Sequence, residues 1–354
     1  MEHKMEETVD LNQALKPVWQ DGGTAWCESV VPIADANGEV WIPLYYHAEE
    51  IISLQNAELR TTYVPGKDYC LENGGIRILP GSSIRPLTMA ECYPAAKGER
   101  TFDGRNGIPY ILFSEGTFFH QHQLAVTYRH SDGWRGSVPQ NDSAHVPLLT
   151  KRLKEKEAFR LLIYGDSITA GGNASGFTGI APYLPRFGEL YAENLMRLYG
   201  VQIDVVNTAV GGMTAEWGAE NAKERAAAYQ PDLVILGFGM NDGSGRRPPE
   251  EFAALTQSIM ADVRAKKTEA EFLLVSSICP NREACLYGNQ EDYPAALAAL
   301  CGNGTVLANV TAVHQELLKR KRYMDMTGNN VNHPNDYLHR IYAQVLMALT
   351  APQL

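Results

Sequence analysis

The second half of the chain alternates short apolar runs with stretches of helical periodicity, and this alternation limits the fold more than any other feature. A buried parallel strand reads as a short, continuous apolar run that ends at glycine or polar residues. Five segments have this character: FRLLIY (159–164), IDVVNTAV (203–210), DLVILGFG (232–239), EFLLVSSI (271–278) and TVLANVT (305–311). The alternation predicts an α/β domain with a parallel sheet, right-handed crossovers and helices on both faces.

The first half is instead built from short runs of β-branched and aromatic residues that are separated by turn signals. VWIPLYY follows an ANGE turn, IRIL follows ENGG, and HQLAVTYRH follows SEGT. This pattern is typical of an antiparallel, all-β sandwich. A chain of 354 residues is long enough for two domains at roughly 150 residues each. We place the boundary in the polar connector near residue 150, which gives domains 1–150 and 151–354.

Composition excludes several classes of function. The net charge of −10 and the short basic runs argue against a nucleic-acid partner, whose binding requires many phosphate contacts. A charged N-terminus and the lack of an apolar stretch of about 18 residues predict no membrane association and a cytoplasmic location. His120 and His122 alternate along an expected strand, but no acidic or cysteine partner is near them in sequence. We therefore expect neither a metal nor another cofactor.

Four polar, glycine-rich turns follow the expected strands or precede the last helix. GDSITAG contains Ser167, NTAVGGMT contains Gly212, GFGMNDGSG contains Asn241, and TGNNVNHPND contains His333. Carboxyl ends of parallel strands meet at one edge of a sheet, where ligands bind. Ser167 alone would be equally consistent with a helix cap. Four such turns at one edge favour a site.

The residue types in these turns fit nucleophilic catalysis. A serine hydroxyl needs an imidazole to take its proton, and His333 lies on a loop, whereas His314 and His339 fall in helical patterns. The oxyanion donors would be the Ser167 and Gly212 backbone N–H groups and the Asn241 side chain.

Two aspartates in the same turns are expected to support the site. Asp166 and Asp242 each lie next to a residue with a proposed catalytic role, and short acidic side chains in tight turns bind local backbone N–H groups.

Taken together, the four blocks resemble the SGNH, or GDSL-type, hydrolases, which supply serine, glycine, asparagine and histidine in that order. The resemblance covers residues 158–350, and the G-x-S-x-G elbow of ordinary α/β-hydrolases is absent. It implies a flavodoxin-like three-layer catalytic domain and a serine esterase that works through an acyl-enzyme. A preceding, jelly-roll-like β-sandwich is similar to the arrangement in bacterial carbohydrate acetylesterases.

One position departs from the family pattern. The family usually has an aspartate three residues before the histidine, and this chain has Asn330. Three hypotheses follow: a Ser–His dyad oriented by a backbone carbonyl, a carboxylate from elsewhere such as Asp325, or Asn330 as a neutral orienting group. We favour the first and third together. Asp336 is expected to cap the last helix, 337–349.

The substrate is less constrained by the sequence. Glu216 and Trp217 follow Gly212, and Trp134 lies near the domain junction, so these three are candidate substrate contacts. No apolar flap for a fatty chain is present, which favours a short acyl group, and the family resemblance favours acetyl on carbohydrate. The expected partner is a small-molecule or oligosaccharide ester, and a homo-oligomer is compatible with the sequence. The alternatives are a lysophospholipase or thioesterase for longer chains, and an inactive carbohydrate-binding protein, which only Asn330 favours.

Overall fold

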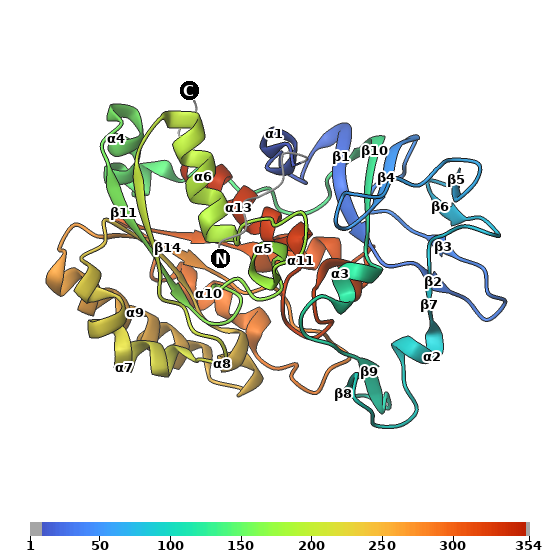
Figure 1. Ribbon diagram of the computed structural model, residues 1–354. Coiled ribbons are helices and arrows are strands. Elements are labelled where there is room, and N and C mark those ends of the chain that lie inside the picture. The colour runs from blue at the N-terminus through green and yellow to red at the C-terminus, as the bar shows by residue number, and fades with distance from the viewer. Residues whose placement is uncertain (1–8, 352–354) are drawn as a thin grey trace.

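The computed structural model describes residues 9–351, which form an α/β part and a smaller N-terminal part of short sheets (Figure 1). The strands of the N-terminal part are β1 (Asp21–Val30), β2 (Ile33–Ala34), β3 (Trp41–Ile42), β4 (Glu50–Asn56), β5 (Tyr69–Glu72), β6 (Gly75–Ile78), β7 (Leu87–Thr88), β8 (Thr101–Asp103), β9 (Tyr110–Leu112) and β10 (Leu124–Gly133). Its helices are α1 (Leu11–Ala14), α2 (Met89–Cys92), α3 (Phe118–His122) and the 3₁₀ turn η1 (Ser143–His145). Two three-stranded sheets, β1-β10-β4 and β3-β6-β5, are the largest of its sheets.

The α/β part contains a five-stranded parallel sheet in the order β12-β11-β13-β14-β15. Its strands are β11 (Phe159–Gly165), β12 (Ile203–Asn207), β13 (Leu233–Gly237), β14 (Glu271–Val275) and β15 (Thr305–Ala308). Its helices are α4 (Pro147–Glu155), α5 (Ser175–Thr178), α6 (Phe187–Tyr199), α7 (Ala215–Arg225), η2 (Ala227–Tyr229), α8 (Met240–Ser244), α9 (Pro249–Lys266), η3 (Gln290–Asp292), α10 (Tyr293–Ala298), α11 (Val310–Leu317), α12 (Tyr323–Met326) and α13 (Asp336–Thr350). Numbered from β11, the strand order is 2-1-3-4-5, that of flavodoxin-like domains. The fold class predicted from the sequence is confirmed.

The central strands β11, β13 and β14 are mostly apolar because both faces of the sheet are covered. Alternate residues of one strand point to opposite faces, so Leu161 and Ile163 pack with α6 and α13, whereas Leu162 and Tyr164 pack with α7 and α9. Figure 1 shows these two helix pairs on opposite sides of the sheet.

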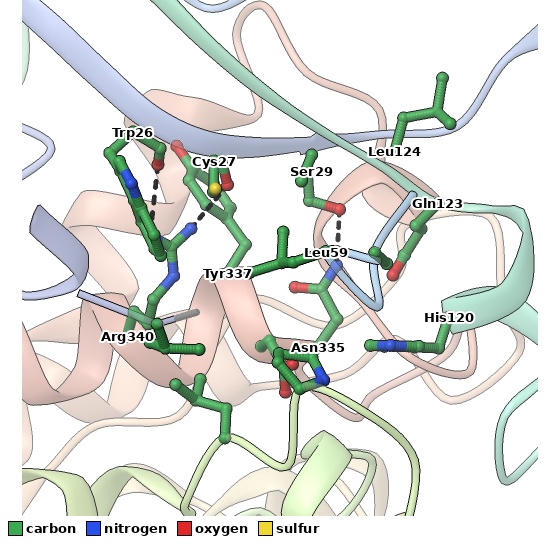
Figure 2. Close-up of a pocket in the computed structure, with 16 residues that line it drawn as sticks. Trp26, Cys27, Ser29, Leu59, His120, Gln123, Leu124, Asn335, Tyr337 and Arg340 are labelled. Carbon is green, nitrogen blue, oxygen red and sulfur yellow. Dashed lines mark hydrogen bonds between the residues drawn. The ribbon is translucent and has the colours of Figure 1, made fainter. Parts of the chain in front are cut away.

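The N-terminal part packs on the α13 side, and the core on that side is shared by both parts. A cavity of about 50 Å³ lies at this contact, between β1 and the start of α13. Figure 2 shows the residues that line it. On α13, the Arg340 guanidinium donates to the carbonyls of Trp26 (3.2 Å) and Cys27 (2.6 Å). Next to it, the Asn335 amide donates to Ser29 Oγ at 2.9 Å. These bonds hold β1 against the α/β part.

Some local expectations differ from the structure. His120 and His122 lie in the short helix α3 and not on a strand, because β10 begins only at Leu124. The last helix begins at Asp336, and its N-cap is Asn335, whose side chain accepts from the Leu338 N–H. Residue 150 falls within α4, and the division into two domains there stays a prediction. None of the helices in residues 9–351 is both long and apolar enough to cross a membrane.

Candidate active site

Ser167 lies two residues after β11, at the point where the strand order of the sheet reverses. β12 and β13 flank β11, and their crossover helices α6 and α7 lie on opposite faces. Such a switch point opens a crevice at the carboxyl ends of the strands. The ends of β11 and β13 also touch: the Asp166 N–H donates to the Gly237 carbonyl at 3.0 Å. A Cβ on Gly165 would lie 2.0 Å from that carbonyl oxygen, so only glycine fits there.

His333 meets Ser167 at this edge. Its Nε2 lies 2.9 Å from Ser167 Oγ, and the imidazole side chain is 16% exposed. A base within hydrogen-bond reach of a hydroxyl is the arrangement that nucleophilic catalysis requires. His314 and His339 are both buried in helices, as expected for packing residues, and burial lowers the pKa of His339 to about 4.

The loop before His333 is folded around Asn329. The buried side-chain oxygen of Asn329 accepts from the backbone N–H groups of Val331, Asn332 and His333, each at 3.0 Å. One amide therefore fixes the backbone from which the imidazole projects.

Asn330 does not orient His333, so that expectation is wrong. Asn330 has φ = +63°, a conformation that asparagine tolerates, and its amide donates to the Leu112 carbonyl at 2.9 Å. Its own carbonyl accepts from the Asn281 amide at 2.7 Å. The side chain points to the N-terminal part and braces the loop.

Two other residues lie next to His333 Nδ1. Asn173 Oδ1 is 2.9 Å from this nitrogen, and Glu115 Oε2 is 3.3 Å from it. Neither was among the sequence candidates. Asn173 lies in the loop that follows Ser167, whereas Glu115 comes from the turn between β9 and α3.

Asp325, considered above as a partner of His333, has a structural role instead. Its carboxylate accepts from the backbone N–H groups of Val31 (2.7 Å) and Arg322 (2.9 Å) and pairs with the Arg322 guanidinium. It therefore ties α12 to the N-terminal part. Of the three sequence hypotheses for the partner of His333, that of a carboxylate from elsewhere is met by Glu115 and not by its example Asp325. The other two named a backbone carbonyl and Asn330, whereas Nδ1 contacts the side chains of Asn173 and Glu115.

The two turns that carry Gly212 and Asn241 are joined next to Ser167. A Cβ on Gly211 would lie 3.7 Å from Ser167 Cβ, so the glycine turn after β12 is adjacent to the nucleophile. Gly212 has φ = +79°, which favours glycine, and it is exposed. The Asn241 amide donates to the Met213 carbonyl at 2.9 Å, which joins the turn after β13 to the same place. The amide has a second hydrogen for a substrate oxygen.

Replacing Asn241 with alanine should lower kcat by about 10²- to 10³-fold with a small change in KM, because an oxyanion donor acts mainly in the transition state. Ester hydrolysis kinetics of the purified variant would measure this. The matched control is Asn221→Ala, since Asn221 also donates from its amide to a backbone carbonyl, that of Trp217, but within α7. A loss equal to that of the control would contradict the role given to Asn241.

Both supporting aspartates are buried and bind backbone N–H groups. Asp166 Oδ1 accepts from the Ile168 N–H at 3.0 Å, and burial raises the pKa of this carboxyl to about 7. Asp242 accepts from the Ala215 N–H, 3.0 Å from Oδ2, and from the Arg247 guanidinium. It therefore joins two turns instead of bracing only its own.

The three candidate substrate contacts have other neighbours. Glu216 pairs with Arg247 at 2.8 Å, and its side chain is exposed. Trp217 packs into the core on the α7 side and has the Arg225 guanidinium over its ring.

Trp134 follows β10 at the end away from α3, about 30 Å along the strand at the usual rise per residue. It packs on Tyr45, with 5.1 Å between the ring centroids. Its place is therefore in the N-terminal core and not in the wall of the Ser167 site.

Comparison with known proteins gives one family and several structural neighbours. The model of the GDSL-like lipase/acylhydrolase family matches residues 163–341, about half of the chain. A search of curated proteins found no match. Similar solved structures include a variant of an acetyl-xylooligosaccharide esterase from Geobacillus, with 20% identity, a TM-score of 0.46, and 55% of this chain and 95% of that chain covered. A two-domain esterase active on acetylated mannans has 21% identity, a TM-score of 0.48, and coverage of 62% and 57%, respectively.

Proposed function

This chain belongs to the GDSL-like lipase/acylhydrolase family, and we propose that within it the protein is a serine esterase that removes short acyl groups, acetyl foremost, from carbohydrate. The observation that carries the serine mechanism is the 2.9 Å contact between Ser167 Oγ and His333 Nε2 at the switch point of the sheet.

The geometry supports an acyl-enzyme route. His333 Nε2 takes the proton of Ser167 while Oγ attacks the ester carbonyl carbon. The Ser167 and Gly212 N–H groups and the Asn241 amide hold the oxyanion. The alcohol then leaves with the proton from His333. Water, deprotonated by the same imidazole, attacks the acyl-enzyme and releases the acid.

The preference for a short acyl group on a polar alcohol is supported by the side chains around Ser167. Glu115, Asn173 and Asn241 are polar, and the turn at Gly211 and Gly212 presents backbone to solvent. A fatty chain would need a contiguous apolar surface at this place. A sugar ester offers hydroxyl groups that such polar groups can bind.

Chain-length preference is the experiment that tests this proposal. Hydrolysis of p-nitrophenyl acetate, butyrate and octanoate should give a kcat/KM for acetate that exceeds the value for octanoate by at least about tenfold. Turnover should fall by about 10⁵- to 10⁶-fold in Ser167→Ala. Acetylated oligosaccharides would then be screened for release of acetate.

Other outcomes would redirect the proposal. A preference for octanoate would contradict the short-chain assignment and favour a lysophospholipase or thioesterase. Equal turnover by the wild type and Ser167→Ala on every ester would contradict the serine mechanism itself.

A further inference from the structure

We propose that the work usually done by one catalytic aspartate is divided in this protein between two positioning residues: Asn173 orients the imidazole of His333, and Glu115 of the N-terminal part supplies the negative charge. This inference rests on the proposed function, because it concerns the base of the same site.

The hydrogen bonds of Asn173 establish which of its amide atoms faces the imidazole. Its Nδ2 donates to the carbonyls of Gly116 (3.0 Å) and Gly328 (3.1 Å), which use both of its hydrogens. Oδ1 therefore faces His333 Nδ1 at 2.9 Å and acts as an acceptor. The proton of the neutral imidazole is then held on Nδ1, and Nε2 is left as the acceptor for the Ser167 hydroxyl. A neutral amide is sufficient for this selection of the tautomer.

Glu115 is fixed on the same side of the ring. Its Oε2 lies 3.3 Å from His333 Nδ1, and its Oε1 accepts from the Asn329 amide at 2.9 Å. Asn329 also holds the backbone N–H of His333, so one buried side chain sets the position of both groups. Partial burial raises the pKa of Glu115. The hydrogen bond to His333, the charge of His333 and the hydrogen bond from Asn329 each lower this pKa, and together they outweigh the effect of burial. The pKa is therefore below its usual value.

The other titratable groups facing the imidazole are less able to supply this charge. Burial is the main cause that raises the pKa of Asp166 to about 7, so this carboxyl is partly protonated at neutral pH. His339, on α13, has its pKa lowered to about 4 by burial and is neutral. The pKa of Glu115 is below its usual value, so this group is ionised, and a carboxylate stabilises the imidazolium that forms when Ser167 loses its proton more than the neutral amide of Asn173 does.

The N-terminal part therefore completes the catalytic machinery. The turn that carries Glu115 and Gly116 lies against the loop after Ser167, through the Asn173–Gly116 bond. The adjacent helix α3 is bound to the segment that follows α5, because His120 Nε2 donates to the Ala181 carbonyl at 2.8 Å. The geometry thus gives this part a role in the reaction that does not depend on whether it binds substrate.

The test is the variant Glu115→Gln in the full-length protein. Gln keeps the size and an oxygen for Asn329 but removes the charge. We expect kcat to fall about tenfold with KM nearly unchanged, and the acidic limb of the kcat/KM profile to move to lower pH by about one unit. The effect stays far below the roughly 10⁴-fold loss of an Asp→Asn change in chymotrypsin-type triads, because Asn173 preserves the tautomer and the Glu115 side chain is 53% exposed.

Two further variants separate charge from structure. Glu115→Asp retains the carboxylate, so the acidic limb of its kcat/KM–pH profile should stay close to that of the wild type. Glu99→Gln removes an exposed glutamate elsewhere in the N-terminal part and should change neither kcat nor the limb. Equal losses in Glu115→Asp and Glu115→Gln, with no shift of the limb in either, would show a structural role and overturn the inference. Wild-type kinetics in Glu115→Gln would also overturn it.

A second readout does not depend on the ester. A fluorophosphonate probe forms a bond between its phosphorus and Ser167 Oγ with loss of fluoride, and the rate reports on activation by His333. Slower labelling in Glu115→Gln than in Glu99→Gln is expected, and equal rates would overturn the inference. Because labelling requires only an activated serine, the positioning role can be tested even if the esters chosen for the proposed function are not substrates.

Discussion

Alanine at Ser167 or at His333 is expected to lower kcat by about 10⁵- to 10⁶-fold, and the double variant is expected to lose no more than either single variant. The reason is that the two side chains act as one unit across the 2.9 Å contact: without Nε2 the hydroxyl keeps its proton, and without Oγ the base has nothing to activate. The residual rate of all three variants would come from the oxyanion donors and from substrate binding. The measurement is kcat on the best ester, with fluorophosphonate labelling as a check on the serine.

The matched control for the histidine is His145→Ala. His145 is half exposed and pairs with Asp142, away from the sheet edge that holds Ser167. It should keep nearly full activity. If the losses at Ser167 and His333 multiplied in the double variant, each residue would act in a separate step, and the assignment of nucleophile and base would fail.

The parallel sheet could be predicted from the sequence because its strands are buried on both faces. The run LVIL in β13, for example, has no polar residue in alternate positions for solvent, and β11 and β13 both end at a glycine where the chain turns. The short N-terminal strands give a weaker signal. VWIPLYY contains only the two-residue strand β3, yet Leu44, Tyr45 and Tyr46 are buried all the same. Hydrophobicity marked the core there, but it could not distinguish a strand from a buried loop.

The site was predictable where its residues follow strand ends and not where they depend on tertiary contact. Ser167 and His333 come together because β11 and the loop before α13 meet at one edge. Asn330 occupies the expected position in sequence, but its positive φ turns the side chain toward Leu112. The contact of Glu115 spans 218 residues, and its sequence surroundings read only as a turn. A short acidic turn is common on protein surfaces, so no local pattern could have identified it.

The buried ion pair between the two parts should make Lys321 indispensable for stability. Lys321 Nζ lies 2.6 Å from Glu28 Oε1, and the two side chains are 0% and 2% exposed. Nζ also donates to the Ser29 carbonyl at 2.9 Å, and Glu28 further accepts from the Tyr45 N–H and the Tyr128 hydroxyl. Lys321→Met removes the cation and leaves the carboxylate buried and uncompensated. We expect a loss of about 3–5 kcal/mol in the free energy of unfolding.

Denaturant unfolding of variants can separate the ion pair from a general loss of packing. The double variant Glu28→Gln with Lys321→Met should recover part of the loss, because it no longer buries an unpaired charge. The control is Lys319→Met, whose partner is Glu316 but whose own side chain is 67% exposed, and its change should stay below about 1 kcal/mol. If the double variant were less stable than Lys321→Met, the buried charge would not be the cause of the loss. The activity of Lys321→Met can be compared with the fraction of this variant that is folded. If activity fell only as much as the folded fraction, the ion pair would stabilise the chain without affecting the position of Glu115. A larger loss of activity in the folded fraction would mean that this ion pair also keeps Glu115 in place beside His333.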